Sequence, residues 1–522
     1  MIIRLQRIGN STLWCFLLHA LAVGALLYTA YITFRYIQQP LVDVHPFRQT
    51  QTALTAYWMR EEGWSLSYET PVVGFPWSIP FEFPIYQALV AALSGFFSLD
   101  LVATGRFVSF LFLVACAWPA FSVSRRLKLP ESVPWVFCAL LWTSPLYVYW
   151  GRTFMIETAA LFFSFAAIPY AIDLVNRIGG WRSAALFVVF ASAGVLQKST
   201  TAGPILLFLL FAAVFFHIRQ FGMGFSMLRR LVRPIAIIII PLIIGLVWAH
   251  YTDIVKIKNP VGNRLTSKAL MSWNFGTLAQ RLNPETWKVV VWKRSLKPNA
   301  GGILGVFLLL LPWVSGQDQR RFAWLVLATI VLFLLPLMIF TNLHYIHEYY
   351  QAGCVLFLIF ALSVSIGGWL KAATGIMVVV PFVTLVFMFL NIMAFHSGYG
   401  IVAARSLAKQ DPLSVKRYKI GFYLRDHTSP DEGLVIFGGD WSSEISFHSQ
   451  RKSMTVPHWF KDYHQVWENP QKYLDGLALG AIVVCPSNAG PTDAEIDERL
   501  SKENNWRLEK VDDCKILLRN FS

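Results

Sequence analysis

The sequence predicts a multi-pass α-helical membrane protein that ends in a small α/β domain. Hydrophobic residues make up 55% of its 522 residues and charged residues only 14%, whereas soluble globular chains are about one-quarter charged. Apolar runs of membrane length recur, for example at 231–248 and 374–395, and a bilayer core needs about 20 apolar residues per helix. We therefore expect a membrane domain over residues 1–400 and a soluble domain over residues 405–522.

The first apolar run, 13–37, follows two basic residues, Arg4 and Arg7. The run is longer than the apolar part of a signal peptide and lacks a small-residue cleavage site. We expect it to be the first membrane helix.

Eleven membrane helices are predicted in all. Their approximate ranges are 12–37, 102–124, 133–150, 154–175, 184–197, 201–218, 232–250, 301–315, 322–340, 351–367 and 373–395. Under this count all the basic connectors can lie in the cytoplasm, where Lys and Arg accumulate: 125–128, 177–182, 219–233, Arg320 with Arg321, and Lys371. The N-terminus is then inside and the C-terminal domain outside.

Two long segments, 38–101 and 251–300, become outer loops in this topology. The apolar run 84–97 has no place in the count, so we expect it to be a re-entrant or juxtamembrane helix on the outer face. Residues 38–83 carry a net charge of −3, and residues 251–300 a net charge of +7. The basic charge indicates either ordinary solvation of a long loop or a phosphate-binding surface facing an anionic partner.

The C-terminal segment from Arg405 onward is nearly neutral, with 16 basic and 17 acidic residues. The excess of positive charge therefore lies in the membrane part, which argues against a nucleic-acid partner. Strands are predicted at 433–438, 480–485 and 515–519, and a helix at 493–502. No nucleotide-binding loop is recognisable, and we assign no catalysis to this segment.

The six cysteines form no metal-binding pattern. We expect Cys15, Cys116, Cys138 and Cys354 to be buried in or beside membrane helices. Cys485 and Cys514 both fall in the outer segment, and the sequence leaves open whether they form a disulfide. His344 and His347, followed by Glu348, do not have the spacing of a zinc protease, so no metal site is predicted.

Charged residues at membrane depth are costly and are functional candidates by default. Asp43 follows the first helix, Glu157 lies early in the fourth, and Lys198 lies at the outer end of the fifth. Structural alternatives remain open for two of them. Lys198 could be a lysine that reaches the membrane surface along its alkyl stem, and Asp43 could be a cap or a loop carboxylate at the start of the following helix.

Together, these residues resemble the GT-C glycosyltransferases, most closely the group of protein O-mannosyltransferases and lipid A aminoarabinose transferases. Asp43, before the segment Arg48-Gln-Thr-Gln-Thr-Ala53, is similar to that group's Asp-Glu-x-Arg-Tyr-Ala motif, although Val44 replaces the second acid. Glu82-Phe-Pro-Ile-Tyr86 resembles its (E/H)-x-P-x-Y step. Glu157 stands where a second acid, usually Asp, is found, and Gln197-Lys198 resembles a Thr-Lys step. The resemblance covers about residues 10–395.

The resemblance implies a GT-C-like fold and a sugar donor linked to polyprenyl phosphate. It implies inverting displacement at the outer face of the membrane, with an acceptor on a glycan, lipid or protein. The short chain without eukaryotic retention signals leads us to expect a bacterial inner membrane. Asp43 and Glu157 are the candidate catalytic residues, with Asp43 as the base. The candidate phosphate-binding residues are Lys198, His344, His347, Tyr350 and Arg264, because a lipid-phosphate leaving group needs cations and hydrogen bonds. The candidate substrate-binding residues are His45, Arg48, Glu82, Tyr86, Arg152 and Glu348. No cofactor is identified with certainty, and a divalent cation is left as an open alternative.

Two other classes of function are considered. A transporter or flippase for lipid-linked sugars would carry charges at the bilayer midplane and repeated halves, and neither is visible in the sequence. A non-enzymatic envelope assembly protein would not require Asp43.

The predicted topology can be tested with a reporter fused after Phe521. The reporter should report the outer compartment, because eleven spans with an inside N-terminus place the C-terminus outside. A cytoplasmic signal would show that the number of spans is wrong by one, and the candidate residues would no longer share a face of the membrane.

Overall fold

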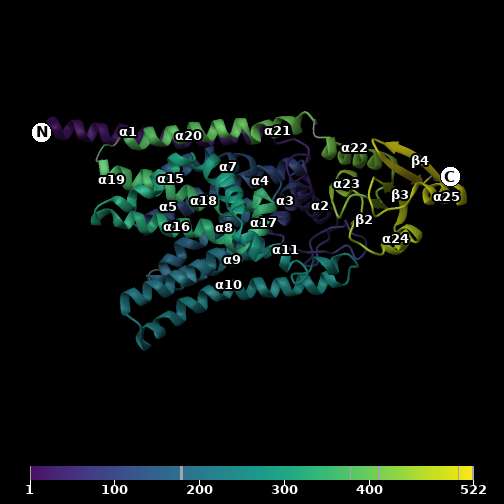
Figure 1. Ribbon diagram of the computed structural model, residues 1–522, viewed down its shortest axis with the longest axis horizontal. Coiled ribbons are helices and arrows are strands. Elements are labelled where there is room, and N and C mark those ends of the chain that lie inside the picture. The colour runs from purple at the N-terminus through teal and green to yellow at the C-terminus, as the bar shows by residue number, and fades with distance from the viewer. Residues whose placement is uncertain are drawn as a thin grey trace. The chain divides into compact units, whose positions relative to one another are not determined.

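A computed structural model describes residues 2–176, 180–374, 376, 378–409, 412–503 and 505–519 (Figure 1). Arg177, counted in a basic connector, and Phe521, the reporter position, lie outside the described residues. The chain divides into two compact units. The helical unit contains Met1–Ile37, Arg106–Trp248 and Met271–Ile401, and the sheet unit contains Gln38–Gly105, Ala249–Leu270 and Val402–Ser522.

Helices make up most of the chain up to residue 407. The longer ones are α1 (Ile2–Arg35), α2 (Pro46–Glu62), α3 (Ile85–Phe96), α4 (Leu101–Ala115), α5 (Ala117–Arg126), α6 (Ser132–Thr143), α8 (Glu157–Val175), α9 (Gly180–Phe221), α10 (Phe225–Ile257), α16 (Arg320–Ile339), α18 (Val355–Ser363) and α20 (Val379–Ser397). Short elements connect them: α7 (Pro145–Trp150), η1 (Gly262–Leu265), α11 (Met271–Phe275), α12 (Leu278–Leu282), α13 (Pro284–Trp287), η2 (Lys288–Leu296), α14 (Lys297–Asn299), α15 (Ile303–Leu310), η3 (Leu311–Val314), η4 (Gln317–Gln319), α17 (Thr341–Ile346), η5 (Glu348–Gly353), η6 (Val364–Leu370), α19 (Lys371–Thr374) and α21 (Tyr399–Leu407).

The prediction of a multi-pass membrane protein is confirmed. Among the described residues, eight helices are long and apolar enough to cross a bilayer. A ninth crossing results if Pro284–Asn299 and Ile303–Val314, which meet at a bend of 89°, form one broken span. The predicted outer loop 251–300 is therefore largely helical, and its last part, Pro284–Asn299, could belong to a span only together with Ile303–Val314.

The predicted number of eleven is not reproduced, and one difference lies at 133–150. This range holds two short helices, α6 and α7, of 12 and 6 residues. Ser144 between them has an extended backbone (φ −58°, ψ 124°) and precedes Pro145, and proline disfavours the helical conformation in the residue before it. The apolar run is long enough for one span, but the proline interrupts the helix.

The other difference concerns α9, which includes both predicted spans 184–197 and 201–218. A straight helix of its 42 residues would be about 60 Å long at 1.5 Å per residue, twice the thickness of a bilayer core. The backbone of Lys198 is not helical (φ −162°, ψ 95°) and joins two helices across a kink. The two predicted helices are therefore the two segments of α9 on either side of Lys198.

The C-terminal part of the sheet unit is the α/β structure that the sequence predicts. Five strands form a mixed sheet in the order β2-β1-β3-β5-β4. Strand β1 is parallel to β2 and β3, whereas β5 is antiparallel to β3 and β4. The strands are β1 (Glu432–Phe437), β2 (Ser453–Val456), β3 (Ala478–Val484), β4 (Trp506–Val511) and β5 (Cys514–Arg519), with helices α22 (Pro412–His427), α23 (Glu444–Ser449), α24 (Tyr463–Glu468), η7 (Pro470–Tyr473) and α25 (Asp493–Lys502).

Alternate residues of the central strands pack on opposite faces of the sheet, as strand geometry requires. Leu434 and Ile436 pack with Ile420 and Leu424 of α22 on one face. On the other face, Val435 and Phe437 pack with residues far away in sequence, namely Leu54, Val72, Val73, Trp77, Ile79 and Val261. Segments 38–105 and 249–270 therefore complete the core of the sheet.

The open question about Cys485 and Cys514 is answered, because the two residues form a disulfide. The bond joins the residue after β3 to the first residue of β5. Cys116, Cys138 and Cys354 are buried as predicted, but Cys15 is exposed, so that prediction was wrong. An apolar helix that faces lipid exposes small side chains, and periodicity in a uniformly apolar run does not indicate which ones.

Candidate functional site

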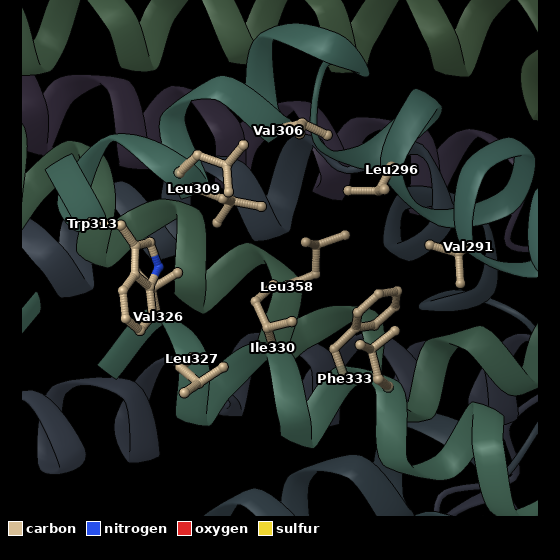
Figure 2. Close-up of a pocket in the computed structure, with 12 residues that line it drawn as sticks. Val291, Leu296, Val306, Leu309, Trp313, Val326, Leu327, Ile330, Phe333 and Leu358 are labelled. Carbon is tan, nitrogen blue, oxygen red and sulfur yellow. The ribbon is translucent and has the colours of Figure 1, made fainter. Parts of the chain in front are cut away.

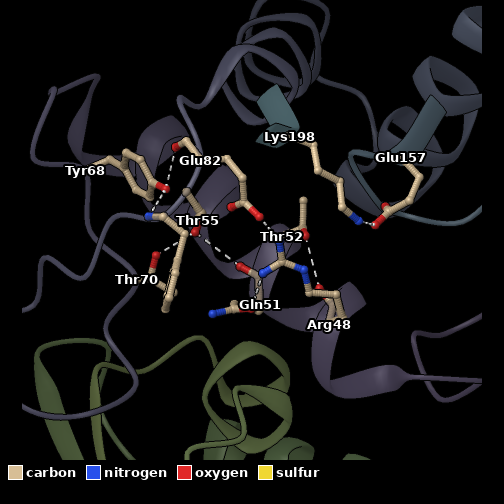
Figure 3. A network of polar contacts seen from close by, with 10 residues as sticks. Arg48, Gln51, Thr52, Thr55, Tyr68, Thr70, Glu82, Glu157 and Lys198 are labelled. Carbon is tan, nitrogen blue, oxygen red and sulfur yellow. Dashed lines mark hydrogen bonds and ion pairs between the residues drawn. The ribbon is translucent and has the colours of Figure 1, made fainter. Parts of the chain in front are cut away.

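The kink in α9 places a lysine beside the first residue of α8. Lys198 Nζ lies 2.5 Å from Glu157 Oε1, and the side chains are only 6% and 2% exposed (Figure 3). The other carboxylate oxygen, Glu157 Oε2, is buried without a hydrogen-bond partner among the described residues. The non-helical backbone at Lys198 and the start of a helix at Glu157 bring two candidate residues into one buried ion pair.

Two tyrosines of η5 cover the lysine. Lys198 Nζ lies 3.9 Å from the centre of the Tyr350 ring and 5.1 Å from the centre of the Tyr349 ring. A cation over an aromatic face is attracted by the ring quadrupole, and more strongly where water is excluded. The His347 ring stacks on both tyrosines. These aromatic residues hold the ammonium group in a largely apolar, water-poor setting.

His344 of α17 belongs to the same cluster, with its ring 5.7 Å from that of Tyr350. Burial, together with the positive charges of Lys198 and Arg294, lowers the pKa of His344 to about 3. The imidazole is therefore neutral at physiological pH. Its Nδ1 is buried and has no hydrogen-bond partner among the described residues, so this atom can make a hydrogen bond to a ligand.

Arg294 of η2 fixes the segment that carries these rings. Its Nη1 donates to the carbonyl oxygens of His344 (2.7 Å) and Tyr345 (2.9 Å), and Gln351 Nε2 donates to the carbonyl of His344 at 3.0 Å. Burial raises the pKa of the neighbouring carboxyl group, Glu348, although the Arg294 charge partly offsets the effect. Arg294 therefore contributes both positive potential and backbone positioning.

Arg152, a candidate substrate-binding residue, is fully buried in the helical unit. Its guanidinium lies over the rings of Tyr36 (4.8 Å) and Tyr149 (5.0 Å). Tyr149 stacks on Tyr399, whose hydroxyl accepts a hydrogen bond from Trp150 Nε1 at 3.3 Å. Stacking of this kind suits arginine rather than lysine.

In the sheet unit, Asp43 is buried, with 3% exposure, and accepts a hydrogen bond from Gln49 Nε2. Gln49 also donates to the carbonyl of Val44 at 3.1 Å. The residue at the N-cap position of α2 is His45, with left-handed backbone (φ 54°) and no side-chain capping bond. The alternative that Asp43 is the cap of this helix is therefore not supported.

Arg48 and Glu82, both candidate substrate-binding residues, form an ion pair with each other. Arg48 also donates to Gln51 Oε1 at 2.6 Å, and Tyr68 donates to the carbonyl of Glu82 at 2.8 Å (Figure 3). Tyr86 is buried and donates to the carbonyl of Gly105 at 2.7 Å. These partners order the segment around α2 and α3. Helix α3 is the short helix predicted at 84–97.

The structure thus brings Glu157, Lys198, His344, His347 and Tyr350 together in the helical unit. Arg264 lies in η1 of the sheet unit, with an exposed side chain. Arg294, Gln49 and Tyr399 were missed. Arg294 was one of nine basic residues in 251–300, and nothing in the local sequence distinguishes it.

A cavity with an apolar lining lies elsewhere in the helical unit, with a volume of about 360 Å³. Its walls come from η2, α15, η3, α16 and α18 (Figure 2). Val291 and Leu296 of η2 are part of the lining, so the cavity adjoins the helix that carries Arg294. Among the residues that the structure describes, no group of three or more His, Cys, Asp or Glu side chains could hold a metal ion.

The sequence matches no protein-family model, and no curated protein matches it significantly. Solved structures nevertheless share its architecture over nearly the whole chain. ArnT from Cupriavidus metallidurans bound to undecaprenyl phosphate superposes with a TM-score of 0.60 at 12% identity, covering 97% of this chain and 98% of that chain. The chain has the GT-C fold.

Arabinofuranosyltransferase AftD from Mycobacteria shares this GT-C fold with a TM-score of 0.51 at 12% identity, covering 97% of this chain and 40% of that chain. Identities this low show the fold, and the fold predicted from the short motifs is confirmed.

The Lys198–Glu157 pair predicts a strong coupling in stability. Glu157→Gln or Lys198→Met alone should lower the free energy of unfolding by about 3–5 kcal/mol, because each leaves one buried charge unpaired. The double variant should lose much less than the sum of the two. Denaturant unfolding in detergent micelles measures all four proteins, with removal of the exposed Lys288–Glu285 pair as a control that should change stability little. Additive losses would contradict the coupling.

Proposed function

We propose that this protein is a membrane glycosyltransferase that moves a sugar from a polyprenyl-phosphate donor to an acceptor hydroxyl. The observation that carries the proposal is the buried Lys198–Glu157 pair beneath Tyr349 and Tyr350. It occurs in the fold of ArnT, which binds undecaprenyl phosphate. A buried lysine in a membrane helix is costly, and an anionic substrate gives a reason for it.

In this proposal Lys198 binds the phosphate of the lipid. An ammonium group has three N–H donors, and one of them faces Glu157 Oε1. The remaining donors are available to phosphate oxygens, while the tyrosine rings keep water away and so strengthen the interaction. His344 and His347 add hydrogen-bonding groups, and Arg294 adds positive potential. As the sugar leaves, the bond from its anomeric carbon to the phosphate oxygen breaks, and these groups stabilise the charge that the phosphate gains.

Asp43 is the proposed general base. The acceptor oxygen attacks the anomeric carbon, its proton passes to the Asp43 carboxylate, and the configuration of the sugar inverts. Gln49 donates to Asp43 Oδ1 and so fixes the orientation of the carboxylate. Polyprenyl phosphate is already stable as an anion, so a protonating acid for the leaving group is not required. Glu157 orients Lys198 and balances its charge between turnovers.

The apolar cavity of Figure 2 suits the isoprenoid chain of the donor. An apolar chain gains about 25 cal/mol per Å² when it moves from water into an apolar cavity. The isoprenoid chain comes from the bilayer, which is equally apolar. The cavity therefore adds little affinity and instead discriminates between chains by their shape. Of the candidate substrate-binding residues, Arg152 and Glu348 remain proposed contacts for the sugar. Arg48, Glu82 and Tyr86 are proposed to act through the backbone that they order.

The proposed location is a bacterial inner membrane, with the sheet unit in the outer compartment. The Cys485–Cys514 disulfide supports this side, because disulfides persist in oxidising compartments such as the periplasm.

Asp43→Asn should retain the fold and donor binding but lower the transfer rate by about 10²–10⁴-fold, because the amide cannot take a proton. The measurement is transfer from a polyprenyl-phosphate sugar by purified protein in lipid. Asp440→Asn removes a half-buried carboxylate elsewhere in the sheet unit and should leave the rate unchanged. A well-expressed Asp43→Asn protein with normal transfer would exclude Asp43 as the base.

Substitutions of Lys198 test the binding of the donor phosphate separately from proton transfer to Asp43. Lys198→Ala and Lys198→Gln should weaken donor binding and turnover to a similar degree, because both lack the charge, whereas Lys198→Arg should retain part of the activity. Added salt should weaken donor binding less steeply than at an exposed site. Donor affinity and transfer rate are measured at two ionic strengths.

The matched control is Lys256→Gln, which removes another buried lysine paired with a carboxylate, Asp253. That change should leave donor affinity at the parental value. If Lys198→Ala binds and turns over the donor like the parent, the phosphate must be held elsewhere, for example by the basic residues of 251–300.

A further inference from the structure

A second cavity in the helical unit is lined by α1, the start of α6, α19 and the start of α20, and the sequence predicts the adjoining connectors on the cytoplasmic side. Its volume is about 220 Å³. The N-terminal part of α1 contributes Trp14, Cys15 and His19, the start of α6 contributes Glu131 and Trp135, and α19 contributes Lys371. None of these residues belongs to the proposed donor site.

Two opposite charges line this cavity without neutralising each other. Glu131 is exposed and Lys371 is partly exposed. Neither side chain makes an ion pair or hydrogen bond with any other residue that the structure describes. A carboxylate and an ammonium group that share a cavity but not a bond are complementary to a ligand that carries both charges.

The rest of the cavity is suited to the depth of lipid headgroups. Trp14 and Trp135 contribute indole rings, and the His19 ring meets that of Trp135 edge-on at 4.2 Å. Tryptophan is enriched where the membrane meets water. The volume equals that of about seven water molecules, which is enough for a headgroup but not for a whole lipid.

The surface beside the cavity is apolar. Leu13 and Phe16 on the same part of α1 are 50% and 66% exposed. Acyl chains attached to a headgroup in the cavity would have this apolar helix face to lie against.

We propose that this cavity binds the headgroup of a zwitterionic aminophospholipid such as phosphatidylethanolamine. Glu131 accepts hydrogen bonds from the lipid ammonium group, Lys371 and His19 face the phosphate, and the two indoles flank the headgroup. An anionic lipid such as phosphatidylglycerol satisfies Lys371 but leaves Glu131 without a cation. The site is therefore selective for the amine, and it does not depend on the proposed transferase activity.

The first test is lipid retention by the full-length protein, measured by native mass spectrometry after partial delipidation and addition of defined mixtures of the two lipids. The parent should prefer phosphatidylethanolamine. Glu131→Gln should lower that preference about three- to tenfold, as expected for loss of one partly exposed charged contact. Lys371→Gln should weaken retention of both lipids. Glu285→Gln, which removes an exposed carboxylate elsewhere in the helical unit, should behave like the parent.

The second test uses Cys15 as a native probe, because it lines the cavity and is exposed, while the other unpaired cysteines are buried. Phosphatidylethanolamine added to detergent micelles should slow the reaction of Cys15 with a maleimide in the parent but not in Glu131→Gln. In a Cys15→Ser background, Val23→Cys on an exposed part of the same helix should show no protection.

Unchanged lipid preference in Glu131→Gln would overturn the proposal. If Lys371→Gln lost retention of both lipids while Glu131→Gln retained both like the parent, the proposal would also be overturned, because the site would then recognise the phosphate and not the amine. Equal protection of Cys15 and Val23→Cys would show coating by micelles rather than binding in the cavity.

Discussion

A buried lysine must be neutralised, and much of the helical unit is arranged around this requirement at Lys198. Its ammonium group lies where water is scarce, so the charge would be prohibitive without Glu157 at 2.5 Å. The contact requires α8 to begin at Glu157 and α9 to break at Lys198, because a continuous helix would point the side chain elsewhere. Tyr349 and Tyr350 can then cover the cation, and Arg294 holds the backbone of the segment before them.

Stability alone does not explain this ion pair, since a well-packed apolar pair of similar size would often make the protein equally or more stable. The presence of the pair is easier to explain if Lys198 exchanges Glu157 for an anionic ligand. The same reasoning applies to His344, which is neutral because of burial and has a ring nitrogen without a hydrogen-bond partner. Two buried polar atoms without hydrogen-bond partners among the described residues, Glu157 Oε2 and His344 Nδ1, thus belong to the same cluster as the paired lysine, and the proposed phosphate would supply a partner for them.

The sequence predicted those features that depend on local chemistry. Charge in an apolar run identified Glu157 and Lys198, and the break between 197 and 201 was placed correctly. Thr492 and Glu495 form a capping box at the start of α25, which is why that helix was located at 493–502. The apolar strands β1, β3 and β5 were found for the same reason. Strand β2 was missed because its Ser453 and Thr455 are buried polar residues. Strand β4 was missed because three of its six residues, Arg507, Glu509 and Lys510, are charged, as an edge strand allows.

Features that depend on distant contacts could not be predicted. Leu54, Trp77 and Val261 complete the core of a sheet whose first strand begins at Glu432, far later in the chain, and no local pattern indicates this. Arg294 and Tyr399 lie in segments that read as a basic loop and the end of a helix. The proline at 145 was visible, but whether it breaks or merely bends an apolar helix depends on what packs against it.

The most direct test of the account is a cryo-electron microscopy structure of the protein in nanodiscs with undecaprenyl phosphate. The phosphate should lie within hydrogen-bonding distance of Lys198 Nζ, about 2.7–3.2 Å, with the ammonium group moved from Glu157 towards the lipid. A phosphate bound away from Lys198, with the Lys198–Glu157 pair unchanged, would contradict it.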